Sequence, residues 1–161
     1  MSQPEASVSV DIAAPPQRVW DVVTDIGLMP RFSTELLSVE WADGFSGPAL
    51  GAQFLGRNRH PAVGEWTTRS EIVVFDPPRA FAWAVGDPEN ASATWAFDLT
   101  PAAEGTRLGY RARIGPGPSG VSMLIEREPH RAQAIVDNRL AQFRDSMRAT
   151  LEGIRERAEK G

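Results

Sequence analysis

The feature that most constrains this chain is a long stretch of helical periodicity near its C-terminus, at residues 131–157. Apolar residues recur there in steps of three and four, the spacing of one face of an α-helix. They are Val136, Leu140, Phe143, Met147, Leu151 and Ile154. Burying six such side chains contributes on the order of 12 kcal/mol before the entropy cost of ordering them. The rest of the chain must therefore supply a large apolar surface that covers this helix.

Between residues 35 and 113 the apolar period changes to two, which predicts six consecutive β-strands. A further alternating stretch at residues 6–12 predicts a first strand. A short helix at 16–25 and a loop or single helical turn at 27–32 follow it. The turns between the six strands are too short for parallel crossovers, so the strands must pair antiparallel. The connector before the long helix reads as a loop that can contain a short helix at 121–127.

Each of the six strands has one apolar face and one polar face, as expected of a sheet covered on one side. The apolar face of the first of these six strands carries Leu37, Val39 and Trp41. The strand with the clearest alternation places there Trp66, Thr68, Ser70, Ile72 and Val74, with Phe75 on its charged face. We predict an α+β fold: one domain over residues 1–161, with a curved seven-stranded antiparallel sheet wrapped around the long C-terminal helix and one or two short helices after the first strand.

The composition excludes several functional classes. A formal charge of −4 and a pI near 5.2 disfavour nucleic-acid binding, which needs a basic field. The chain has no cysteine, so it has no thiol nucleophile and no disulfide framework. It shows neither a signal-peptide pattern at its N-terminus nor an apolar run of about 18 residues. We therefore expect a soluble cytoplasmic protein without stable membrane insertion, either a monomer or a homodimer.

Nine segments, distributed in order over nearly the whole chain, are similar to a known family. They are IAAPPQRVWDVVTD, MPRF, VEW, GAQFLGRNR, EWTTRSEIV, DPPRAFAW, TWAFDLTP, GTRLGYRAR and MRATLEGI. Together they resemble the polyketide cyclase/dehydrase group of the START-like (SRPBCC) superfamily. The resemblance implies the helix-grip fold of that group, with a hydrophobic cavity between sheet and helix that holds a lipid, a polyketide or a similar ligand. Because the superfamily includes cyclases, dehydratases and lipid carriers, the resemblance leaves the chemistry open.

The alternation of each strand also gives the positions that face the helix. Aromatic residues at those positions could simply fill a core. Asn58, Thr68, Ser70 and Tyr110 are polar, however, and burying an unpaired polar group costs roughly 1–3 kcal/mol. They indicate a pocket with some polar lining. The ligand-binding candidates are Trp41, Phe54, Asn58, Trp66, Thr68, Ser70, Trp83, Trp95, Phe97, Tyr110 and Arg139.

Arg139 is included because it flanks the buried stripe of the long helix, where the resemblance suggests an arginine that meets a ligand oxygen. Surface pairing of Arg139 with Asp137 or Asp145 is the alternative. For catalysis the candidates are Tyr110, Asn58 and His60. His60 would have to fold over the cavity opening to transfer a proton, and a solvated loop position is the simpler interpretation.

The sequence contains no metal-binding or cofactor-binding motif, so we expect neither a metal nor a cofactor. Three functions remain open. The first is binding of a hydrophobic small-molecule ligand, and the second is a cyclase or dehydratase reaction in the same cavity. The third is a protein-interaction module with a filled core. The volume of the interior separates the third function from the other two, because a small-molecule site needs about 300 Å³ or more.

Overall fold

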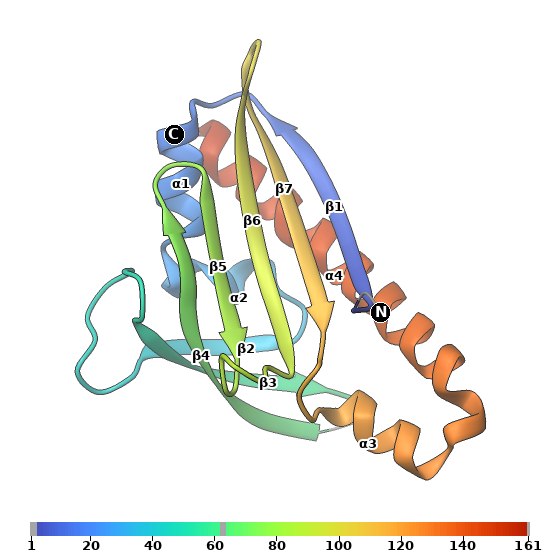
Figure 1. Cartoon of the computed structure of the whole chain (residues 1–161). Coiled ribbons are helices and arrows are strands. Elements are labelled where there is room, and N and C mark those ends of the chain that lie inside the picture. The colour runs from blue at the N-terminus through green and yellow to red at the C-terminus, as the bar shows by residue number, and fades with distance from the viewer. Residues whose placement is uncertain (1–2, 62–63, 161) are drawn as a thin grey trace.

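The computed structural model describes residues 3–61 and 64–160 and confirms the predicted α+β architecture (Figure 1). In chain order the elements are β1 (Glu5–Ile12), α1 (Pro16–Val23), the 3-10 turn η1 (Ile26–Leu28), α2 (Met29–Phe32), β2 (Leu36–Trp41), β3 (Gln53–His60), β4 (Gly64–Asp76), β5 (Ala80–Val85), β6 (Ala93–Ala102), β7 (Gly105–Ile114), α3 (Gly120–Arg127), the 3-10 turn η2 (Pro129–Arg131) and α4 (Ala132–Lys160). The connector before α4 therefore does contain a helix.

The seven strands form one antiparallel sheet in the order β1-β7-β6-β5-β4-β3-β2. Strands β2 to β7 follow one another as a meander, and β1 adds to the free edge of β7 in register from Glu5 opposite Arg113 to Ile12 opposite Thr106. The sheet bends strongly, so that β2 and β3 run almost across the direction of β6 and β7 (Figure 1). This bend produces the concave face that the sequence pattern requires.

Helix α4 packs against β1, β7, α1, α2 and α3. Five of the six residues in its predicted apolar stripe are buried, beginning at Leu140, while Val136 is only half-buried. No residue from Ala132 to Arg139 is buried. The C-terminal part of α4 is thus embedded in a dry core with α1, where Val19 and Ile154 are inaccessible to solvent. Space between helix and sheet is therefore left on the N-terminal side of this packed end of α4.

A β-bulge in β2 corrects one predicted face. Leu36 pairs with Asn58 and Ser38 pairs with the preceding Arg57, so Leu37 is the extra residue in this strand. An inserted residue reverses the alternation on one side of the bulge. Leu37 is consequently 39% exposed, and Leu36 faces the interior in its place. The prediction that Leu37 points inward was wrong.

A second bulge, in β4, has the same effect. Ile72 pairs with Trp83 and Val74 pairs with Ala82, which leaves Val73 as the extra residue. Val74 is therefore 41% exposed, while Phe75 turns inward and its ring centroid lies 5.4 Å from that of Trp20. The assignments of Val74 to the apolar face and of Phe75 to the charged face were wrong for this reason. None of the helices in the described ranges is long and apolar enough to cross a membrane.

Candidate functional site

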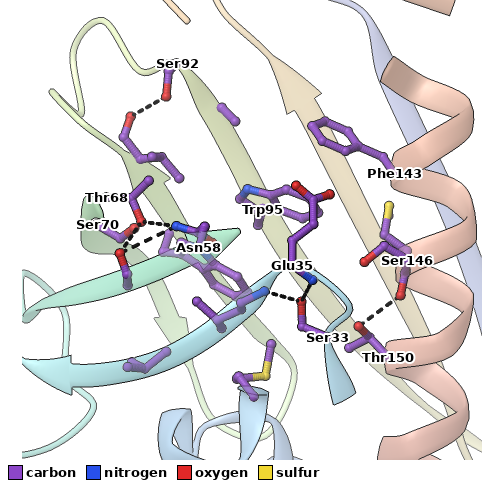
Figure 2. A pocket seen from close by; sticks show the side chains of 18 of the residues that line it. Ser33, Glu35, Asn58, Thr68, Ser70, Ser92, Trp95, Phe143, Ser146 and Thr150 are labelled. Carbon is purple, nitrogen blue, oxygen red and sulfur yellow. Dashed lines mark hydrogen bonds between the residues drawn. The ribbon is translucent and has the colours of Figure 1, made fainter. Parts of the chain in front are cut away.

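A cavity of about 420 Å³ lies between the concave face of the sheet and the middle of α4. Its walls come from strands β2 to β7, from the segment 23–36, from the loop before α3 and from the part of α4 between Arg139 and Thr150. Figure 2 shows the side chains of the sheet and of α4 facing one another across this space. Phe143, Met147 and Thr150 are buried on α4 and line the cavity, so the cavity lies along the buried side of the helix.

Most of the predicted ligand-binding residues line this cavity. They are Phe54, Asn58, Trp66, Thr68, Ser70, Trp83, Trp95, Tyr110 and Arg139. Phe97 does not line it: this residue is fully buried, and the ring of Tyr110 stacks on it with a centroid separation of 4.1 Å. Trp41 lies farther along β2, where it packs edge-on against Phe54 and lines a separate hollow beside the β2–β3 loop. Strand alternation identifies the inward face but does not tell a cavity wall from the layer behind it.

His60 lies outside this cavity. It borders a neighbouring groove of about 340 Å³ between α3, the start of α4 and the adjoining ends of β3 and β4. The groove and the cavity share Trp66, Gly120, Val121 and Arg139, so these residues lie between the two spaces. Of the three residues considered for catalysis, Tyr110 and Asn58 line the cavity and His60 does not.

The central wall of the cavity is a continuous aromatic surface. The ring centroid of Tyr110 lies 5.7 Å from that of Trp95 and 6.5 Å from that of Trp83. Trp95 in turn lies 4.9 Å from Phe143 on α4, so the aromatic surface extends from the sheet onto the helix. Offset and tilted ring pairs of this kind are favourable and rigid. The wall therefore presents flat apolar faces in fixed positions.

Two hydroxyl groups, those of Tyr110 and Ser70, open onto this wall. Within residues 3–61 and 64–160, no hydrogen bond is made by the hydroxyl of Tyr110 or by that of Ser70. Both residues are nonetheless buried. Burial raises the pKa of Tyr110 above its usual value, because the phenolate would lose its hydration. Tyr110 therefore stays protonated and can donate a hydrogen bond to a molecule in the cavity.

Asn58 and Thr68 form a second polar group on neighbouring strands (Figure 2). The Asn58 Nδ2 donates to Thr68 Oγ1 at 3.4 Å, and both side chains reach the carbonyl of Gly56 at 3.4–3.5 Å. These bonds are long, so they satisfy the groups only weakly. Gly56 makes the arrangement possible, since a Cβ there would lie 3.1 Å from Thr68 Oγ1 and 3.2 Å from Leu36 Cδ1.

The charged part of the lining consists of Glu35 and Arg139. Arg139 Nη2 donates to Glu35 Oε1 at 3.2 Å and Arg139 Nη1 donates to Glu35 Oε2 at 3.3 Å, which is a bidentate pair. The expected alternative, pairing of Arg139 with Asp137 or Asp145, was wrong. Both of those acids lie on α4 itself, whereas Glu35 reaches Arg139 from the segment just before β2.

The sequence comparisons give the family. A model described as "Polyketide cyclase / dehydrase and lipid transport" matches residues 3–159. The chain belongs to this family. A comparison with curated proteins found no match.

Solved structures of similar proteins agree with this membership. A polyketide-cyclase-like protein from Corynebacterium glutamicum is 29% identical, with a TM-score of 0.67 over 96% of this chain and 90% of that one. The di-domain ARO/CYC protein StfQ of the steffimycin biosynthetic pathway is 16% identical, with a TM-score of 0.76 over 98% of this chain. This chain spans only 51% of StfQ. A Thermus thermophilus protein is 16% identical, with a TM-score of 0.66 over 96% of this chain and 97% of that one. At 16% identity, these last two likenesses establish the helix-grip fold alone.

Several lining residues of this family member were missed by sequence reasoning. They are Ser33, Glu35, Leu36, Ser92, Phe143, Ser146 and Thr150. Phe143 belongs to the predicted apolar stripe of α4, which located it on the buried side but not at a cavity. Thr150 is polar and was not part of that stripe, although it is buried on α4. Glu35 precedes β2 in a segment without periodicity, and no pattern distinguished it from a surface acid. Among the described residues, no group of three or more His, Asp or Glu side chains is placed to hold a metal ion.

Proposed function

We propose that this chain binds one hydrophobic small molecule, at least partly aromatic, in the cavity between the sheet and α4. The observation that carries the proposal is the cavity itself: about 420 Å³ of space with aromatic walls, onto which the hydroxyls of Tyr110 and Ser70 open without a hydrogen bond to any described residue. Small-molecule sites have this size and composition. A family described by cyclase, dehydrase and lipid-transport functions is consistent with such a ligand.

The titratable groups favour binding over catalysis. Among the described residues that line the cavity, these groups are Glu35, Tyr110 and Arg139. Tyr110 has a raised pKa and stays neutral, while Glu35 and Arg139 are bonded to each other. A general base or acid works best with a pKa near the operating pH, and this lining has no free group of that kind. Binding without a chemical step requires only the features already present.

A cyclase or dehydratase reaction is the second candidate, and the neutral Tyr110 hydroxyl is the observation that favours it. A hydrogen bond from Tyr110 to a ligand carbonyl would polarise that carbonyl, and the aromatic walls would hold a flexible chain in a folded shape. Turnover measurements with Tyr110→Phe and Asn58→Ala separate the two functions. Unchanged turnover of every polyketide-type substrate together with weaker binding would remove the enzymatic candidate.

The experiment that tests the proposal uses two neighbouring threonines of β4. Thr68 lines the cavity and Thr67 is exposed on the other face of the sheet. Thr68→Phe fills part of the cavity, while Thr67→Phe makes the same chemical change outside it. Binding of a hydroxymethyl-anthraquinone is followed by quenching of tryptophan fluorescence. We expect Thr68→Phe to weaken binding at least about tenfold and Thr67→Phe to leave it within about twofold of the wild type.

Equal affinity of the wild type and Thr68→Phe would place the probe elsewhere and would overturn the proposal. Thermal unfolding of both variants serves as the control for folding. A wild-type protein that binds neither this probe nor a long-chain alcohol such as dodecanol would contradict the proposal as well.

A further inference from the structure

The Glu35–Arg139 pair is unusual because it stands in the wall of an otherwise uncharged cavity. The side chains of Glu35 and Arg139 are 18% and 24% exposed, so both are largely removed from water. Figure 2 shows the Glu35 side chain extending from beside Ser33 into the space between the sheet and α4. No other charged side chain among the described residues lines this cavity.

Contacts on both sides fix the pair. The Ser33 Oγ accepts hydrogen bonds from the backbone N–H groups of Glu35 and Leu36 at 3.2 and 3.0 Å, which sets the backbone that carries the carboxylate. Arg139 Nη1 also donates to Gln142 Oε1 at 2.8 Å, and the guanidinium lies 4.6 Å from the ring centroid of Phe143. The guanidinium is therefore held by a carboxylate, an amide and an aromatic face before any ligand enters.

This arrangement determines which ligands can enter the cavity at low cost. A carboxylate that leaves water for an apolar cavity loses its hydration and needs a cation there to compensate. Arg139 is the cation in this lining, and Glu35 already neutralises it and would repel a second carboxylate. A ligand hydroxyl or carbonyl faces no such cost, because the hydroxyls of Tyr110 and Ser70 are available to it.

We propose that Glu35 is a specificity-determining residue: by occupying Arg139 it makes the cavity select uncharged hydrophobic alcohols, phenols and ketones and reject the corresponding carboxylates. This inference rests on the proposed function, since it concerns the ligand of the same cavity. It excludes free fatty acids and aromatic acids as preferred ligands at neutral pH, where they are ionised.

The first test compares two probes on the wild-type protein at neutral pH. A hydroxymethyl-anthraquinone and the anthraquinone carboxylate substituted at the same ring position differ only in the charge and oxidation state of one carbon. We expect the alcohol to bind at least about tenfold more tightly than the carboxylate. Similar affinities for the two probes would overturn this inference and leave the proposed function standing. Binding of neither probe, and no binding of dodecanol either, would contradict the proposed function itself.

The second test moves the preference by substitution. Glu35→Gln keeps the size of the side chain and an acceptor for Arg139 but removes the neutralising charge. We expect the ratio of alcohol affinity to carboxylate affinity to fall at least about tenfold in this variant. The double variant Glu35→Gln with Arg139→Gln removes both charges, so its ratio should stay within about threefold of the wild-type value.

The ratio of the two affinities is the readout because a general loss of affinity cancels in it. Circular dichroism and thermal unfolding show whether each variant is folded. If Glu35→Gln does not fold, the wild-type comparison still decides the inference. An unchanged ratio in a folded Glu35→Gln protein would overturn the assignment to Glu35, and a ratio in the double variant that follows Glu35→Gln would do the same.

Discussion

Replacement of Tyr110 by Phe tests whether its hydroxyl faces open space. The Tyr110 ring stacks on Phe97 with a centroid separation of 4.1 Å and an interplanar angle of 12°, and Phe keeps that contact. The hydroxyl has no partner among the described residues, so its removal breaks no hydrogen bond within them. Since the hydroxyl opens onto the cavity, we expect Tyr110→Phe to change the free energy of unfolding by no more than about 1 kcal/mol in either direction.

Thr106→Val is the matched control, because it also removes a hydroxyl from β7. Thr106 is 1% exposed and its Oγ1 donates to the carbonyl of Ala14 at 2.8 Å. Removing that donor breaks a buried hydrogen bond, and we expect a loss of about 1–3 kcal/mol. Urea unfolding of both variants measures the difference, with the slope of the transition checked for constancy.

In ligand affinity the order of the two variants should reverse, so that Tyr110→Phe has the larger effect. A hydrogen bond from Tyr110 to an uncharged ligand contributes about 0.5–1.5 kcal/mol, so Tyr110→Phe should weaken the alcohol probe by roughly two- to twelvefold. Thr106 does not line the cavity, so Thr106→Val should leave the affinity of the folded protein for the probe unchanged. A Tyr110→Phe protein that is destabilised by more than about 1 kcal/mol and binds the probe normally would refute this reasoning.

Three further predictions follow from the same structure. The folded pKa of Tyr110 lies above its unfolded value of 10.0, so the wild type should lose stability as pH rises above about 10, by up to ~1.4 kcal/mol per pH unit, and Tyr110→Phe should lack this loss. Phenolate absorbance reports directly on the ionisation of the single tyrosine. Ionisation of Tyr110 in the folded protein near pH 10 would contradict this prediction. Gly105→Ala places a Cβ 2.1 Å from the Ile12 carbonyl oxygen and should lower the free energy of unfolding, measured with a chemical denaturant, by more than about 2 kcal/mol. In Gly47→Ala the new Cβ meets no atom within 4 Å, so the free energy of unfolding should hardly change. Equal losses in the two variants would count against the packing described. Leu151 is buried in the dry part of α4, and Leu151→Ala should lower the free energy of unfolding by about 2–5 kcal/mol. Leu124 is 46% exposed on α3, and Leu124→Ala should lower it by less than about 1 kcal/mol. The reverse order of the two variants in thermal unfolding would disprove the position of the core.

The architecture was predictable because its signals are long and regular. The apolar stripe of α4 and the alternation of six strands each extend over many residues, and short turns left antiparallel pairing as the only choice. The two bulges were not predictable, since Leu37 and Val73 are ordinary strand residues whose insertion shows only in the pairing with the neighbouring strand. A bulge changes which face follows it, so it misplaced Val74 and Phe75 as well.

The candidate site was predictable in part for a related reason. Alternation assigned Trp83, Trp95 and Tyr110 to the face that lines the cavity, but it also selected Phe97, which lies beneath Tyr110. Glu35 was missed because its role depends on Arg139, which is more than a hundred residues away in the chain. Contacts of that kind depend on the bend of the sheet and on the position of α4 relative to the sheet. No local sequence pattern encodes either of them.

The five tryptophans offer the most direct test of a ligand cavity between the sheet and α4. Trp66, Trp83 and Trp95 line the cavity, whereas Trp20 and Trp41 lie outside it. The indole N–H resonances of an isotope-labelled protein can be followed by NMR while the alcohol probe is added. The three cavity indoles should shift in proportion to saturation and the other two should stay nearly still. Shifts confined to Trp20 and Trp41, or no shift at probe saturation, would contradict the account.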